Sequence, residues 1–266
     1  MGWLAVVTSP AAVWVVLAGQ NTFFSIALFY GGFRLLDRIP AVAGILFGLR
    51  SYKPQICVLL PLALFAARQW RGLGWTIGTA FALSFASMAM FGFDVWLAFL
   101  DTARQAGSPR LADEMFGHIY MHMTTLLAAA RIVGLPVPLA SALQVGGAIL
   151  AIVAVWCAFR RHGSNDARVA VLAAATFLIS PYALNYDLLL LMPAAVALFR
   201  LGLAQGFHPG ERLIYVMLWV IPTLCIILNR IDLPVTPLVV LAFGGIAWMR
   251  LKNQPKVELP SAVRAG

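Results

Sequence analysis

The chain has 266 residues, of which 62% are hydrophobic and only 11% are charged, and its formal net charge is +9. Soluble domains are about 45–50% apolar and about 25% charged, so this composition excludes a soluble globular domain. The positive charge does not indicate nucleic-acid binding, because the basic residues stand at the ends of apolar runs rather than along one face. We therefore predict an all-α, polytopic integral membrane protein.

Ten apolar stretches are candidates for membrane-spanning helices, although several are shorter than the about 20 residues of a full span. They cover residues 3–18, 22–36, 40–52, 55–67, 74–91, 137–159, 169–182, 186–201, 213–228 and 234–249. The third and fourth meet at Lys53-Pro54, either as one kinked helix or as two half-helices, because Pro breaks or kinks a helix. Short or broken helices are tolerated where they line a cavity.

No linker divides these stretches, so we predict a single transmembrane domain over residues 1–250 with one long loop at about 92–136. In that loop, the apolar run 120–135 is expected to form an interfacial or re-entrant helix against the outer leaflet. Residues 251–266 are polar and are predicted to be a disordered tail. The start of the chain lacks the basic region and cleavage site of a signal peptide.

The distribution of Lys and Arg predicts the orientation, because cytoplasmic loops are enriched in them. With the N-terminus in the cytoplasm, most of the 19 Lys and Arg residues lie on the inner side, including the pair Arg160-Arg161. We therefore expect a plasma-membrane protein with both termini in the cytoplasm. The unusual polar residues then gather on the extracytoplasmic face, as expected for an active site at the outer leaflet.

Lys53 is the strongest single candidate for binding. An ammonium group in an apolar run is costly unless it faces water, an anion or the protein interior, and phosphate suits it well. The alternative is a lysine at a helix end that extends its amine to the interface. Gln20 and Asn21 are candidates for binding sugar hydroxyls, or Asn21 caps the next helix. Gln55 belongs to the same polar segment as Lys53.

The catalytic residue is unknown from the sequence, and Asp187 is a weak candidate. It stands at the head of an apolar run, where it either faces a cavity as a hydroxyl ligand or base, or is stabilised by the helix dipole. Four acids of the long loop are further possible bases, although most loop acids are simply solvated. They are Asp94, Asp101, Asp113 and Glu114.

We expect no metal ion and no cofactor. His118 and His122 are four residues apart and share a helical face, but no third ligand is spaced to complete a metal site. A phosphate contact or an interface role is favoured for them. The sequence also has no Gly-rich nucleotide loop, nucleophilic Ser elbow or Cys/His zinc spacing. Their absence argues against a soluble nucleotide-sugar donor and favours a lipid-borne one.

Several motifs, taken in order, resemble glycosyltransferase family 87. They are Gly19-Gln20-Asn21-Thr22, the run 43–48, Tyr52-Lys53-Pro54-Gln55, the connector 68–71, and Ser180-Pro181-Tyr182 followed by Tyr186-Asp187. The resemblance implies a GT-C-like fold and an inverting transfer of mannose from a polyprenol-phosphate donor. The acceptor is an envelope glycolipid or glycan at the extracytoplasmic face. The partners so implied are the donor, the acceptor and membrane lipids.

The resemblance also implies roles for named residues. Lys53 is the first candidate for a phosphate contact and Arg230 the second. Contacts with the sugar or acceptor are assigned to Gln20, Asn21, Tyr182, Tyr186 and Asp187. No metal is needed, because the leaving group is a lipid phosphate.

One departure from the family pattern concerns its presumed catalytic aspartate, which lies in the first outer loop. The first acidic residue here is Asp37, on the inner side of the predicted topology. We therefore expect an N-terminally truncated member whose base is missing or replaced. The alternatives are a polar-lipid transporter or flippase, and an inactive truncated member that only binds lipid or a partner. Transporters tend to place polar residues near the membrane midplane, whereas here they lie at one face.

Overall fold

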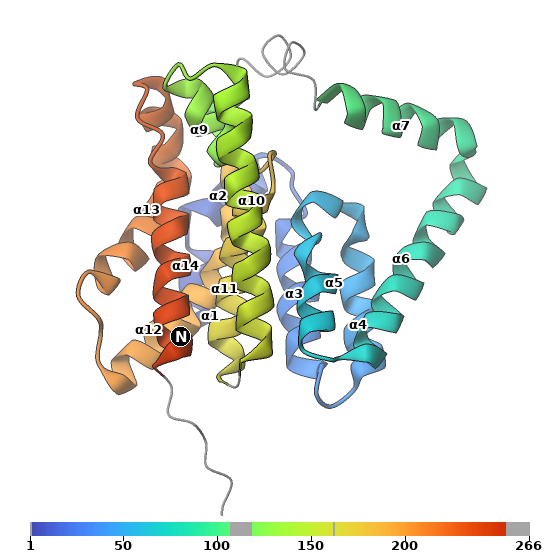
Figure 1. Ribbon diagram of the computed structural model, residues 1–266, viewed down its shortest axis with the longest axis horizontal. Helices are drawn as coiled ribbons and strands as arrows, with labels where there is room; N and C mark the ends of the chain where they lie inside the picture. The colour runs from blue at the N-terminus through green and yellow to red at the C-terminus, as the bar shows by residue number, and fades with distance from the viewer. Residues whose placement is uncertain (1, 107–118, 162, 254–266) are drawn as a thin grey trace, which may run out of the picture.

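The computed structural model describes residues 2–106, 119–161 and 163–253, apart from the side chains of residue 3 and residues 103–106. Within these ranges the chain is helical, and the one β-type pairing is an isolated antiparallel bridge between Met123 and Leu184. The all-α prediction is confirmed. The helices of Figure 1 are α1 (Gly2–Val7), α2 (Pro10–Leu17), α3 (Thr22–Leu35), α4 (Pro40–Leu49), α5 (Leu59–Ala66), α6 (Trp70–Phe91), α7 (Phe93–Ala106), α9 (Leu126–Ile132), α10 (Val137–Arg160), α11 (Asn165–Ile179), α12 (Met192–Gln205), α13 (Glu211–Arg230) and α14 (Thr236–Lys252).

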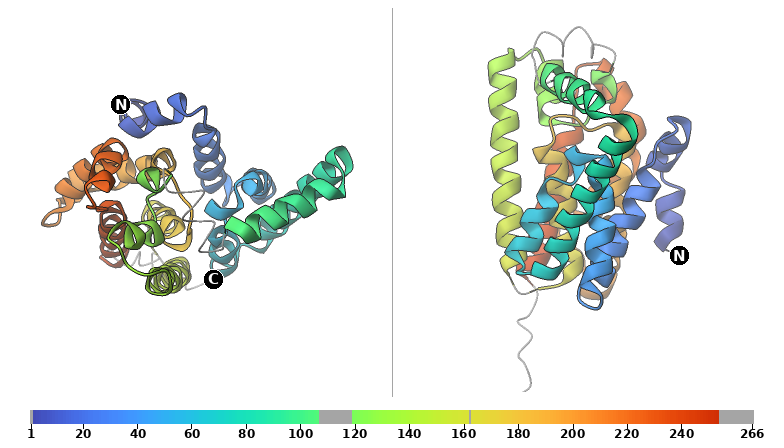
Figure 2. Two further views of the ribbon diagram at one scale, coloured as in Figure 1. Left: turned by 90° about the horizontal axis from the view of Figure 1, so that it is seen from above. Right: turned by 90° about the vertical axis from the view of Figure 1, so that its right-hand side faces the viewer.

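α11 forms the centre of the bundle. Its residues from Val169 to Phe177 are all buried, and α10, α12 and α14 pack around it. The run 173–175 is three consecutive Ala residues, and small side chains let neighbouring helices approach closely in a membrane protein. α6 packs against α4 at its lower end, whereas its upper end and α7 extend away from the bundle (Figures 1 and 2).

Four helical segments are long and apolar enough to cross a membrane: Trp70–Phe91, Val137–Arg160, Asn185–Gln205 and Glu211–Arg230. Each coincides with a predicted span. Other predicted spans are short or broken, as expected. The stretch 3–18 divides into α1 and α2 at Pro10, which occupies the first turn of α2, while buried Ser9 accepts a hydrogen bond from the Ala12 amide. Proline ends the preceding helix because it has no amide hydrogen to donate.

The basic connectors all lie at one end of the bundle. They join α3 to α4, α5 to α6, α10 to α11 and α12 to α13, and α14 ends at the same level (Figure 1). The structure thus agrees with the one-sided distribution of Arg and Lys. Which end faces the cytoplasm remains a prediction.

The chain between α4 and α5 breaks at the predicted position. α4 ends at Leu49, and two single-turn 3₁₀ helices follow, Arg50–Tyr52 and Pro54–Ile56. Lys53 lies between them with non-helical backbone angles (φ −123°, ψ 72°). The two predicted stretches are therefore two separate helices rather than one kinked helix, and Lys53 is held in the break.

The apolar run 120–135, predicted as an interfacial or re-entrant helix, is only partly helical. It contains a 3₁₀ turn, Tyr120–His122, and the seven-residue helix α9, whose Leu126, Ala128 and Ala130 are buried. Two buried amide side chains anchor it: Asn229 Nδ2 lies 3.0 Å from the Met121 carbonyl, and Gln144 Oε1 accepts from the Leu127 amide at 3.1 Å. These contacts satisfy backbone groups inside the protein, so the run packs against α10 and α13. The predicted tail after residue 253 lies outside the described residues.

Two glycines let α4 lie against α6. A Cβ atom at Gly48 would lie 2.5 Å from the Thr79 Cβ and 2.7 Å from the Thr76 carbonyl oxygen, and one at Gly44 would meet the Gly72 carbonyl. Small residues four apart are a common device for close helix contact in membranes. The contact matters for the site because the Lys53 segment follows directly from α4.

We predict that Gly48→Ala destabilises the protein, while Gly78→Ala does not. Overpacking at a close helix contact costs about 1–3 kcal/mol. A Cβ at Gly78 meets no atom within 4 Å, so there alanine is neutral or stabilising, because it restricts the unfolded chain. Thermal unfolding of both variants in the same detergent measures the difference. Equal melting temperatures would contradict the close contact.

Candidate functional site

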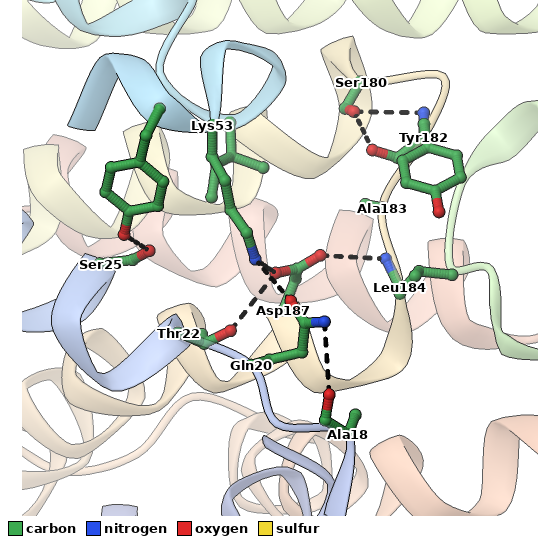
Figure 3. Close-up of polar contacts among 12 residues, drawn as sticks. Ala18, Gln20, Thr22, Ser25, Lys53, Ser180, Tyr182, Ala183, Leu184 and Asp187 are labelled. Carbon is green, nitrogen blue, oxygen red and sulfur yellow. Dashed lines mark hydrogen bonds and ion pairs between the residues drawn. The ribbon is translucent and has the colours of Figure 1, made fainter. Parts of the chain in front are cut away.

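An ion pair between Lys53 and Asp187 lies beyond the ends of α4 and α11 that are opposite the basic connectors. The Lys53 Nζ is 3.2 Å from Asp187 Oδ1, and the two side chains are 15% and 8% exposed (Figure 3). Burial weakens solvent screening, so each charge depends strongly on its partner. The pair joins the α4–α5 break to the segment after α11.

Asp187 is fixed by the start of the 3₁₀ segment Asn185–Leu191. Its Oδ2 accepts a hydrogen bond from the Leu184 amide at 3.3 Å, and its Oδ1 accepts one from Thr22 Oγ1 at 3.5 Å. The first bond caps the segment, a contact that the helix-dipole interpretation of Asp187 did not include. The helix-dipole interpretation of Asp187 does not account for the ion pair with Lys53 or for the contact with Thr22. Asp187 is therefore both a cap and the acidic member of a polar cluster.

Gln20 reaches the same place from the α2–α3 turn. Gly19 adopts a positive φ of 60°, which glycine accommodates without steric cost. The Gln20 Oε1 then accepts from Lys53 Nζ at 3.4 Å, and its Nε2 lies 3.5 Å from the Ala18 carbonyl (Figure 3).

The aromatic ring of Tyr186 lies beside the Lys53 amine. The Lys53 Nζ lies 5.3 Å from the centre of its ring, within the range of a cation–π interaction. We call Gln20, Thr22, Lys53, Tyr186 and Asp187 the Lys53 cluster.

A second polar contact supports the Lys53 segment from α3. The hydroxyls of Tyr52 and Ser25 are 2.6 Å apart, and the Tyr52 ring stacks on Phe24 with centroids 6.0 Å apart. On the other side, buried Asn185 donates to the carbonyl of Pro222, which lies inside α13, at 3.0 Å. Both neighbours of the ion pair are thus tied to adjacent helices.

Four of the predicted site residues lie in the Lys53 cluster: Gln20, Lys53, Tyr186 and Asp187. Others lie around it. Asn21 is exposed at the N-cap of α3 and makes no capping bond with its side chain. Gln55 is half-buried, and Tyr182 packs beside Met123, Ala128 and Leu184. Arg230 is exposed at the end of α13.

The sequence analysis missed three contributors. Thr22 was quoted only as part of a motif, and the Leu184 amide has no sequence signal, because it is a backbone group. Arg50 was not among the predicted site residues, although it is 1% exposed. A charged residue inside an apolar run was the signal that identified Lys53, and Arg50 carries the same signal.

The other candidate acids and ligands do not join this cluster within the described residues. Asp94 and Asp101 are exposed on α7, and the His122 ring makes an edge contact with Trp14, their centroids 6.0 Å apart. His118, Asp113 and Glu114 lie outside the described residues. Over the part of the chain that the structure describes, no three His, Cys, Asp or Glu residues are grouped to hold a metal ion.

The cluster offers both a cation and a carboxylate to a ligand. An ammonium group has three donors, and the contacts to Gln20 and Asp187 use two of them. The third is left for an anion. The Asp187 carboxylate accepts from three donors and keeps lone pairs that can bind a hydroxyl or take its proton.

We predict that Lys53→Met destabilises the protein more than the double variant Lys53→Met/Asp187→Asn. Removing one partner of a buried pair costs about 3–5 kcal/mol, because the other charge is left uncompensated. A double-mutant cycle of unfolding in detergent measures the coupling. Lys252→Met, at an exposed residue in the last turn of α14, is the matched control and should be neutral. Additive costs in the cycle would show that the two side chains do not interact.

Comparison with known proteins identifies the chain through its sequence. The family model of glycosyltransferase family 87 matches residues 1–181, which include Gln20, Thr22 and Lys53 and end before Asp187. Searches of curated proteins and of solved structures return no match. The match spans well over half of the 266 residues. The chain therefore belongs to glycosyltransferase family 87, and it is a membrane glycosyltransferase.

Proposed function

We propose that this membrane glycosyltransferase transfers a hexose, with mannose the first candidate, from a polyprenol-phosphate-linked donor. The acceptor is a glycolipid or glycan of the cell envelope. The observation that carries the proposal is the buried Lys53–Asp187 pair with Gln20 beside it. It combines a cation for phosphate, an amide for sugar hydroxyls and a carboxylate for an acceptor hydroxyl.

The position of the cluster supports a lipid-linked donor. Lys53 and Asp187 lie in breaks between apolar helices, beyond the ends of α4 and α11 that are opposite the basic connectors. If those connectors face the cytoplasm of a plasma-membrane protein, as the charge rule predicts, the cluster is at the extracytoplasmic face. A phosphate anchored there by a polyprenol chain reaches Lys53 without leaving the membrane.

In the proposed step an acceptor hydroxyl oxygen attacks the anomeric carbon of the donor sugar. The bond from that carbon to the phosphate oxygen breaks, and its electron pair stays with the polyprenol phosphate. Lys53 stabilises the negative charge of this leaving group. The hydroxyl proton passes to a base, for which Asp187 is the candidate within the described chain, because Thr22 and Leu184 hold its carboxylate in place.

We predict that Lys53→Gln lowers mannose transfer about 10- to 100-fold, since a hydrogen bond to a charged group is worth about 1.5–3 kcal/mol. Membranes that contain the protein are incubated with polyprenyl phosphate [¹⁴C]mannose, and labelled lipid and glycan products are counted. Asp187→Asn is measured in parallel, and Lys252→Gln is the matched control, with activity unchanged. Size-exclusion profiles of the solubilised variants establish that each is folded.

Two results would contradict the proposal in different ways. Binding of the labelled donor without transfer, in wild-type protein, would remove Asp187 as the base. A wild-type protein that neither binds nor transfers the labelled donor would contradict the choice of a lipid-phosphate donor. Translocation of the labelled lipid across a vesicle membrane without transfer would instead support a transporter.

A further inference from the structure

Arg50 is buried without enough partners for its charge. Its side chain is 1% exposed, and one hydrogen bond is formed, from Nη2 to the Ile56 carbonyl at 3.4 Å. Its Nε and Nη1 are buried and have no hydrogen-bond partner among the described residues. The guanidinium carbon also lies 4.6 Å from the centre of the Phe29 ring. No carboxylate forms an ion pair with it in the part of the chain that the structure describes.

Arg250, at the other end of the bundle, shows what a satisfied buried arginine looks like in this protein. Its Nε and Nη2 bind the two carboxylate oxygens of Glu211 at 2.9 and 2.6 Å, and Nη2 also donates to the Gly206 carbonyl at 2.7 Å. Tyr215 completes that network by donating to Glu211. Arg250 is thus neutralised within the fold, whereas Arg50 is not.

An unpaired buried charge is unfavourable, and an apolar residue of similar volume is usually the more stable choice. The contact with Phe29 does not require a charge, because a thioether packs on an aromatic ring as well. The fold alone therefore does not explain an arginine at this position. Buried donors without partners point instead to a group that the protein receives from outside.

Arg50 is part of the same short segment as Lys53. The Arg50 carbonyl accepts a hydrogen bond from the Lys53 amide at 3.0 Å, and both residues belong to the turns between α4 and α5. The segment and its partner thus hold two cations, the buried Arg50 and the partly buried Lys53, against one carboxylate, Asp187. In a medium of low dielectric constant, the excess positive charge attracts an anion over several ångströms.

We propose that Arg50 is a specificity-determining residue, whose charge makes the Lys53 site select a ligand that carries a negative group. This inference rests on the proposed function, because the negative group is taken to be the phosphate of the lipid-linked donor. Arg50 acts through its charge and through the two donors that the fold leaves unpaired. It stabilises the anion when the site is filled, and it costs stability when the site is empty.

The test compares two probes that differ only in charge, farnesyl phosphate and farnesol, on the purified full chain in lipid nanodiscs. Dissociation constants are measured by calorimetry, and melting temperatures are measured without ligand. For Arg50→Met we expect a higher melting temperature than wild type. We also expect the preference for farnesyl phosphate over farnesol to fall at least about tenfold. Arg50→Lys keeps the charge and should retain most of the preference.

Arg250→Met is the matched control, because it removes a buried arginine far from the site. It should lower the melting temperature, since it strands Glu211, and leave the preference unchanged. An Arg50→Met variant with a lower melting temperature and the wild-type preference would overturn the inference and make Arg50 a structural residue. Equal weakening of both probes would do the same.

The outcome also separates this inference from the proposed function. A wild-type protein that prefers farnesyl phosphate in an Arg50-dependent way, yet transfers no sugar, would support the charge selection and contradict the transferase step. A wild-type protein that transfers mannose but binds both probes equally would support the transferase step and contradict the charge selection.

Discussion

The ion pair between Lys53 and Asp187 joins two segments that are 134 residues apart in the chain. Each partner lies where a helix is interrupted, so neither charge is placed by a regular backbone. Burial makes each charge dependent on the other, because a single buried ion is far more costly than a pair. The α4–α5 break, the α2–α3 turn and the segment after α11 are thereby held in one place.

Irregular backbone at membrane depth requires partners for its polar groups. The structure supplies them from side chains: Asp187 binds the Leu184 amide, Asn185 binds the Pro222 carbonyl, and Asn229 binds carbonyls of the turn at 120–123. The same interruptions that weaken the helices therefore bring the residues of the Lys53 cluster together. A continuous helix through residues 40–66 would bury its backbone groups but could not bring the Lys53 amine to Asp187 in this way.

Among the residues whose burial is described, two arginines are buried, and they differ in their pairing. Arg250 is fully engaged by Glu211 near the basic connectors, and that network stabilises the α12–α13 turn. Arg50 is left with unpaired donors beside the Lys53 cluster. Natural proteins often accept such local instability at functional sites, where a ligand completes the interactions.

The amino-acid sequence by itself determined the class of fold, the family and much of the site. Apolar runs and sparse charge predicted an all-α membrane protein. The backbone groups of such runs must be hydrogen-bonded internally in lipid, and a helix does this within one segment. A lysine next to a proline in such a run indicated both the helix break and the residue that we propose to bind phosphate. The tertiary structure decided what local pattern cannot encode: that Asp187 is the partner of Lys53, that Thr22 and the Leu184 amide hold its carboxylate, and that the run 120–135 packs inside the protein. It also decided that Arg50 is buried and incompletely paired while Arg250 is satisfied. Pairing and burial depend on which distant segments meet, and in a chain this apolar the lipid-facing and protein-facing sides of a helix have similar sequences.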